Sequence, residues 1–282
     1  MKKLFFTITF CFVAFTVFSQ NAALLINSAN EALQSKDYEK AFELYEAAMK
    51  NLGNVQVDAS INYNTGFAAF HASEFYNAIP YFQKAISAKI NVPKSYEFIG
   101  HSYARLNMFN EAITAYKKAV ETGSKEKGNL YYNAGVVAYQ SQKFDIAVEF
   151  FTLAIKENYE NSDNAYLNKS IILKGLNKDE ESKQTLIEAL QKFEDNSKII
   201  RVLTNIYIDE AISLYKNGAD ILKAAGEKVK TGFITDSIYI SEVNIAKAEF
   251  KSAIEILTKA KALDASDMNV EKLIDACEAV LK

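Results

Sequence analysis

The chain of 282 residues has few of the side chains on which metal and nucleic-acid chemistry depend. It contains no tryptophan, two histidines and two cysteines, so a zinc cluster of histidine and cysteine ligands is hard to assemble. Arg105 and Arg201 are the only arginines, and the net charge is −3. Arginine makes the two-point contacts that read phosphate and guanine, and nucleic acids require a basic surface. We therefore expect no metal site and no nucleic-acid partner.

The sequence also lacks the motifs of nucleotide-binding and hydrolytic enzymes. It contains no P-loop, no dinucleotide fingerprint, no H-E-x-x-H and no nucleophile elbow. Its densest acidic run, Asp179–Glu181, borders an expected turn and is typical of a solvated surface. The sequence therefore predicts a protein that is not an enzyme, with no catalytic residue and no cofactor.

The first nineteen residues have the pattern of a secretory signal peptide. Lys2 and Lys3 precede an apolar run, Leu4 to Phe18, that is short for a hydrocarbon core of ~30 Å. The small residues Val17 and Ser19 predict cleavage after Ser19; an uncleaved anchor is the alternative. The pattern predicts an exported protein with no transmembrane segment in its mature chain. The periplasm is the expected location, with the cell surface or secretion as alternatives.

Small residues recur along the rest of the chain at intervals of 34 to 37 residues. One series is Ala29, Gly66, Gly100, Gly135, Ser170 and Thr204. A second series follows it, at Ala41, Ala78, Ala112, Ala147 and Ser182. A large residue comes four positions later, at Tyr45, Phe82, Tyr116, Phe151 and Leu186. The pattern predicts pairs of antiparallel helices joined by short turns such as Ser73–Glu74, which must stack because no pair can bury its apolar face alone.

The pattern resembles tetratricopeptide repeats over roughly residues 21–265. A strong unit reads Tyr63-Asn64-Thr65-Gly66, and then Phe75, Ala78, Phe82 and Ala85. The resemblance implies an all-α fold, a right-handed α-solenoid of about six helical hairpins. The expected segments are a signal peptide at 1–19, a solenoid at 20–265 with units at about 22–55, 59–92, 93–127, 128–162, 163–196 and 197–265, and a capping helix at 266–282.

The last unit is expected to be longer than the others. Helical periodicity continues from Thr204 to about Ala225, although Asn217–Gly218 is a turn signal that predicts a break or kink. Residues 226–237 are expected to form a loop, followed by a helix to about Leu263. Of the two prolines, Pro93 is expected to begin a helix and Pro80 to lie close to a first turn, where a missing N–H costs little.

The resemblance further implies that a protein or peptide partner binds a concave groove lined by the first helix of each hairpin. Alignment of the repeats places the following residues there: Asn27, Asn30, Tyr63, Asn64, Phe67, His71, Lys94, Phe98, His101, Tyr132, Asn133 and Asn168. Four of the asparagines, at 27, 64, 133 and 168, share one repeat position. An amide there could bond a peptide backbone or, equally, a neighbouring group of the protein itself.

The expected function is therefore that of a protein-interaction scaffold, which would suit assembly of the cell envelope. The charged clamp by which some family members hold a peptide carboxylate is not expected, because Lys94 is its only basic residue here. A glycan-binding or small-ligand solenoid is the alternative. A continuous groove favours a peptide, whereas a closed pocket around Tyr63, Phe67, Phe98 and Tyr132 favours a small ligand. The partner and the oligomeric state are not encoded in any motif.

Overall fold

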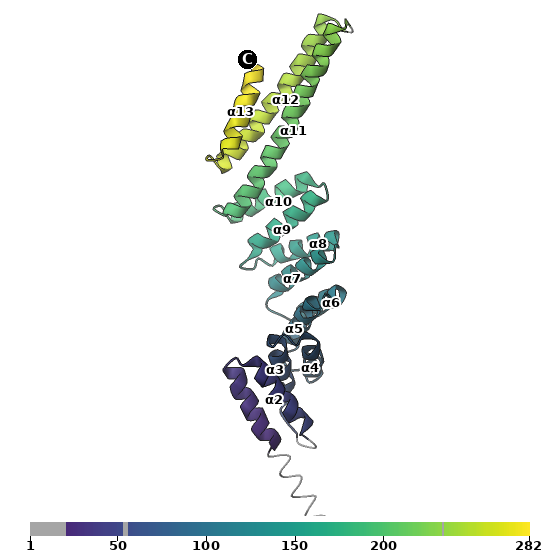
Figure 1. Ribbon diagram of the computed structural model, residues 1–282, viewed down its shortest axis with the longest axis vertical. Coiled ribbons are helices and arrows are strands. Elements are labelled where there is room, and N and C mark those ends of the chain that lie inside the picture. Colours follow the sequence, from purple (N-terminus) through teal and green to yellow (C-terminus); the bar gives the residue numbers. More distant parts are fainter. Residues whose placement is uncertain (1–20, 53–55, 233) are drawn as a thin grey trace, which may run out of the picture. The chain divides into compact units, whose positions relative to one another are not determined.

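The computed structural model describes residues 21–52, 56–232 and 234–282, so the predicted signal peptide lies outside the described residues. Within these ranges every regular element is an α-helix (Figure 1), which confirms the all-helical prediction. The chain divides into two compact units, Met1–Ser162 and Asp163–Lys282.

The first unit is a succession of helical hairpins. A helix over residues 21–34 is followed by α2 (Tyr38–Lys50), and three further pairs follow. They are α3 (Ser60–His71) with α4 (Phe75–Ser87), α5 (Val92–Arg105) with α6 (Phe109–Glu121), and α7 (Lys127–Gln140) with α8 (Phe144–Lys156). Helices α2, α4 and α6 each also pack against the first helix of the next hairpin. The core is therefore shared between neighbouring hairpins, as expected of stacked repeats.

Each short hairpin turns at one residue with a left-handed backbone. These residues are Lys36, Ser73, Asn107, Gln142 and Asn177, with φ between 58° and 65°. The following N–H closes the turn; that of Glu74, for example, donates to the carbonyl of Ala69 at 2.8 Å. This is the Schellman ending of a helix, for which glycine is the usual residue. The turn at Ser73–Glu74 is confirmed, and its left-handed residue recurs with the same spacing as the small residues.

The glycines of the repeat allow a buried ring of the second helix to approach the first. A methyl group on Gly66 would lie 3.1 Å from the ring of Phe82, and one on Gly100 would lie 2.7 Å from the ring of Tyr116. At Gly135 the corresponding distance, to the ring of Phe151, is 2.9 Å. Distances below 3.0 Å leave no space for a side chain at Gly100 and Gly135, and at 3.1 Å the ring of Phe82 would have to shift slightly to admit one at Gly66.

The second unit consists of one short hairpin, one long hairpin and a final helix. The short hairpin is α9 (Ser162–Gly175) with α10 (Asp179–Lys192), in which the hydroxyls of Ser170 and Ser182 lie 2.8 Å apart. The long hairpin is α11 (Ser197–Lys230) with α12 (Asp236–Leu263). Helix α13 (Met268–Leu281) packs on α12 and buries Val270 and Cys277.

The structure differs from the sequence predictions at three places. Helix α11 passes through Asn217–Gly218 to Lys230, so the predicted break is wrong and the loop is shorter than residues 226–237. Gly218 instead admits the ring of Phe250, which would lie 2.9 Å from a methyl group at this position. Pro93 is the second residue of α5, as expected, but Pro80 is the sixth residue of α4. Pro80 therefore lies beyond the first turn, at an exposed position of the helix.

Candidate functional site

Aromatic side chains gather on the first unit, around α3. Tyr63, Phe67 and His71 follow one another at intervals of four residues and so lie on one side of this helix. The ring of His71 stacks on Tyr38 of α2 with centroids 4.7 Å apart, and it lies 4.3 Å from Phe67. Phe67 and Tyr63 are 6.4 Å apart. We call Tyr38, Tyr63, Phe67 and His71 the aromatic face; His71 is exposed and the other three are half-buried.

The aromatic face is uncharged near neutral pH. Partial burial against the neighbouring rings lowers the pKa of His71, which favours the neutral imidazole in the stack with Tyr38. Burial, and then the negative charge of Glu97, raise the pKa of Tyr63 to about 12. The face therefore offers ring surfaces and a neutral phenol rather than a charged group.

Phe98 lies beneath this face rather than on it. It is 8% exposed and stacks on Phe82, with centroids 5.2 Å apart and an interplanar angle of 4°. Its ring also contacts Phe67 at 5.4 Å and Phe70 at 5.0 Å. Phe98 thus supports the exposed rings from the core. Tyr132 belongs to a different contact, because its ring packs against Phe151 at 5.5 Å and Tyr159 at 6.0 Å.

Lys94 and His101 are joined through a buried carboxylate. Glu97 of α5 lies 2.8 Å from the ammonium of Lys94 and 3.7 Å from Nε2 of His101. Nδ1 of His101 is 2.9 Å from the hydroxyl of Tyr116 in α6. Burial acts to raise the pKa of Glu97, but its hydrogen bonds with His101 and Lys94 outweigh burial and lower it. The ammonium of Lys94 is thus paired with a carboxylate of its own helix.

The asparagines of the predicted groove lie in different surroundings. The hydroxyl of Tyr45 donates to Oδ1 of Asn30 at 2.5 Å, and the side chain of Asn64 bonds the same hydroxyl. Asn30 and Asn64 therefore have partners within the protein. Asn27 is exposed, and Asn133 is half-buried on α7. Asn168 lies on α9, in the second unit.

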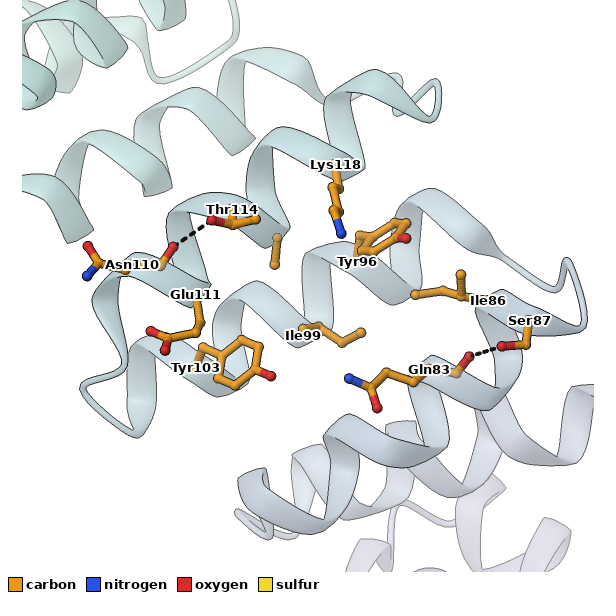
Figure 2. A pocket seen from close by; sticks show the side chains of 11 residues that line it. Gln83, Ile86, Ser87, Tyr96, Ile99, Tyr103, Asn110, Glu111, Thr114 and Lys118 are labelled. Carbon is orange, nitrogen blue, oxygen red and sulfur yellow. Dashed lines mark hydrogen bonds between the residues drawn. The ribbon is translucent and has the colours of Figure 1, made fainter.

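The structure also contains a pocket that the sequence analysis missed, between α4 and α6 with α5 as its floor (Figure 2). Its volume is about 530 Å³. Tyr96, Ile99 and Tyr103 line it from α5 at intervals of three and four residues, and Lys118 lies 5.6 Å from the ring centroid of Tyr96. The remaining lining residues are Gln83, Ile86, Ser87, Asn110, Glu111, Thr114 and Ala115. None of the residues expected in the groove lines this pocket, although the spacing of Tyr96, Ile99 and Tyr103 could have indicated that they share one side of α5.

A charged hollow of about 390 Å³ lies in the second unit, where α9 and α10 meet α11. Its lysines are paired: Lys174 lies 2.7 Å from Asp209, and Lys183 lies 2.8 Å from Glu180 and 2.9 Å from Glu210. Burial acts to lower the pKa of Lys183, but its hydrogen bonds with the two glutamates raise it. Each lysine thus lies beside a carboxylate, so the hollow has no net attraction for an anion.

Comparison with known proteins identifies the repeats. One model of the tetratricopeptide repeat family matches residues 26–93, and another matches residues 93–122. Residues 26–122 contain tetratricopeptide repeats. The matches cover the hairpins that carry the aromatic face and the pocket of Figure 2. No helix in the described part of the chain has the length and apolar character of a membrane span.

Solved tetratricopeptide repeat structures share the fold of the chain. A tetratricopeptide repeat protein from Parabacteroides merdae is 19% identical, with a TM-score of 0.51, and the match covers 92% of this chain and 99% of that one. YrrB, described as a tetratricopeptide repeat protein with an unusual peptide-binding site, is 18% identical over 63% of this chain and 89% of its own, with a TM-score of 0.50. The curated proteins give no significant match. At these identities the likeness shows the fold alone.

Proposed function

We propose that the protein is a non-enzymatic scaffold that binds a peptide segment of a partner protein through the aromatic face. The observation that carries the proposal is the stack of Tyr38 on exposed His71, which continues through Phe67 to Tyr63. Contacts with the rings beneath fix these side chains, so binding them costs little conformational entropy. Aromatic side chains held in this way are enriched at the centre of protein interfaces.

The chemistry of the face indicates an apolar or aromatic peptide rather than a charged one. Lys94, the one lysine among the predicted groove residues, is paired with Glu97. Exposed Asn27 could donate to and accept from a peptide backbone. We therefore expect an affinity that changes little with salt, because it rests on apolar area and neutral hydrogen bonds. The peptide-binding site for which YrrB is named supports the proposal only as a property that this fold can carry.

The test is a screen of the mature chain, residues 20–282, against a display library of random peptides, followed by affinity measurement in solution. The binding variant is Tyr38→Ala with His71→Ala, which removes the stack and leaves buried Phe98 intact. Tyr76→Ala is the matched control, since Tyr76 is an exposed aromatic residue on α4. We expect the double variant to lose on the order of tenfold in affinity and the control to keep it. Equal binding by all three proteins would refute the proposed face.

We also propose that the protein is exported to the periplasm and acts in assembly of the cell envelope. The support is the basic and apolar pattern of residues 1–19. Fractionation of the native cells with an antibody tests this, because cleavage after Ser19 gives a mature chain that begins at Gln20. Recovery of the uncleaved chain from the cytoplasm would refute it, and recovery from the medium or by surface labelling would support the alternative locations.

A small polar ligand is the second candidate, and the pocket of Figure 2 is the observation that favours it. Its volume lies within the range of ligand sites, ~300–1,000 Å³. Two tyrosine rings and the amides of Gln83 and Asn110 are side chains suited to a sugar. A thermal-shift screen of soluble glycans tests this, with Tyr103→Ala as the pocket variant. A shift that Tyr103→Ala leaves unchanged would exclude this pocket.

A further inference from the structure

The far end of the long hairpin, in the second unit, carries a cluster of exposed apolar side chains. Val229 in the last turn of α11, and Ile238, Tyr239, Ile240 and Ile245 of α12, are between 37% and 58% exposed. We call these five residues the apolar tip. The other exposed large apolar residues of the described chain are scattered, apart from Tyr139, Phe144 and Ile146 at one turn of the first unit. Single exposed apolar residues are normal on a protein surface, but a cluster of them marks a surface that contacts a protein, a ligand or a membrane.

Helix α13 leaves the apolar tip uncovered. It has 14 residues against the 28 of α12, or about 21 Å against about 42 Å at the rise of an α-helix. In Figure 1 the hairpin end, where α11 passes into α12, extends beyond the C-terminal end of α13. The part of α12 that α13 covers holds buried Leu257 and Ala260, whereas Ile238 and Ile245 lie nearer the tip.

The apolar residues surround the tip instead of forming one stripe. Successive residues of an α-helix point about 100° apart, so Ile238, Tyr239 and Ile240 span about 200° of its circumference. Ile245 lies on the side of Ile238, two turns further along. A partner helix or a second copy of the chain would cover one side and leave Ile240 or Ile238 in water. A medium that encloses the tip covers all of them.

The charges around the tip fit an interface that is nearly neutral. Between Thr231 and Ser241 the sequence has one charged residue, Asp236. Lys228 is paired with Glu242 at 2.6 Å, which leaves exposed Lys230 as the nearest basic side chain. From Ile221 to Lys247 there are four lysines and three acidic residues. A lysine beside an apolar end can extend its ammonium to a headgroup region, and tyrosine is enriched at that depth.

We infer that the apolar tip inserts into the interface of a lipid bilayer and docks the second unit on a membrane surface. The apolar side chains then lie in the boundary between headgroups and acyl chains, about 5–10 Å deep. Because the net charge of the segment is small, insertion depends on apolar area and needs no anionic lipid. This inference is independent of the aromatic face, which lies in the other unit.

The experiment uses the absence of tryptophan from the chain. Tyr239→Trp places a single fluorescent reporter at the tip, and Tyr139→Trp places one at an exposed tyrosine of the first unit. On addition of phosphatidylcholine vesicles we expect the emission of Tyr239→Trp to shift to the blue and to be quenched by brominated acyl chains. The emission of Tyr139→Trp is expected to stay unchanged. No shift at the tip with either phosphatidylcholine or phosphatidylglycerol vesicles would overturn the inference.

Vesicle flotation of the mature chain, without the reporter, provides the second measurement. Ile238→Ser with Ile240→Ser is expected to lower vesicle affinity by about tenfold or more, because each change removes exposed apolar surface. Ile171→Ser is the matched control, since Ile171 is a 52% exposed isoleucine on α9 of the same unit, and it should bind like the wild type. Two results would overturn the inference: equal binding by all three chains, or a dimer in sedimentation that the double variant abolishes without lipid.

Discussion

Replacement of Gly100 by alanine tests the close packing on which the short hairpins depend. The added methyl group would lie 2.7 Å from Cδ1 and Cε1 of Tyr116, closer than packed carbon atoms approach. The ring has little freedom to move away, because Tyr116 is 2% exposed and its hydroxyl is hydrogen-bonded to His101 at 2.9 Å. The variant must therefore push α5 and α6 apart or break this bond.

Three contributions determine the expected change in the free energy of unfolding of Gly100→Ala. Alanine gains about 1 kcal/mol over glycine inside a helix. Overpacking of a filled core costs about 1–3 kcal/mol. Loss of the Tyr116–His101 hydrogen bond costs about 1 kcal/mol. Together they give a loss of about 1–3 kcal/mol. We therefore expect Gly100→Ala to be less stable than the wild type by about 2 kcal/mol.

Gly226→Ala is the matched control, because Gly226 is inside α11 and a methyl group there would meet nothing within 4 Å. The same substitution should stabilise the chain here, by about 0.5–1 kcal/mol. Urea denaturation followed by far-UV circular dichroism measures both variants. The two changes should have opposite signs, and Gly100→Leu should unfold its hairpin. If Gly100→Ala were as stable as Gly226→Ala, or if Gly100→Leu kept the wild-type thermal midpoint, the assigned contact would be refuted.

Three further predictions concern the turns and the buried polar network. Gln142→Gly should raise the free energy of unfolding by about 0.5–1 kcal/mol in urea, because φ is 58° at this turn residue and glycine accepts that backbone without strain; a loss would contradict the Schellman assignment. Tyr116→Phe should cost about 1 kcal/mol, since it removes the partner of His101, and double-mutant analysis with a His101 variant should show the coupling. The pKa of Glu97 is lowered in the folded chain, so its contribution to stability is present above the pKa of the unfolded state and is lost as pH falls through the folded value. Glu97→Gln should therefore lose stability less steeply on acidification than the wild type, and equal slopes in acid titrations would show that Glu97 does not contribute.

The fold was largely predictable because its regularity is present in the residue types themselves. A small residue opposite a large one specifies how closely two helices pack, as Gly66 with Phe82 and Gly135 with Phe151 show. The turns were less predictable, because their left-handed positions hold lysine, serine, glutamine and asparagine in place of glycine. The prediction was wrong at Gly218, because this glycine was interpreted as a turn residue and not as one that admits a ring. The dipeptide Asn–Gly favours a turn locally, but the long hairpin uses its glycine to admit Phe250.

The sequence could predict on which side of a helix each residue of the candidate site lies, but not how deeply its side chain is buried. Alignment brought Tyr63, Phe67 and His71 to one side of α3, where the structure also places them. It could not show that Phe98 is buried against Phe82, because the stacking of neighbouring hairpins determines that depth. The pocket of Figure 2 lies at such a junction, since α4, α5 and α6 come from two hairpins, and so no single repeat encodes it.

Each short hairpin of the first unit buries a ring at the same position of its second helix, at Tyr45, Phe82, Tyr116 or Phe151. The type of this ring explains which polar residues of the predicted groove are needed for packing. Where the ring is a tyrosine, the residue fifteen positions earlier is polar and bonds its hydroxyl: Asn30 with Tyr45, and His101 with Tyr116. Where the ring is a phenylalanine, that position is apolar, as Phe67 before Phe82 and Val136 before Phe151. A buried hydroxyl requires a partner, so the two positions are determined together. Asn30 and His101 are thereby required for packing of the rings, and the aromatic face is left as the surface that we propose for a peptide.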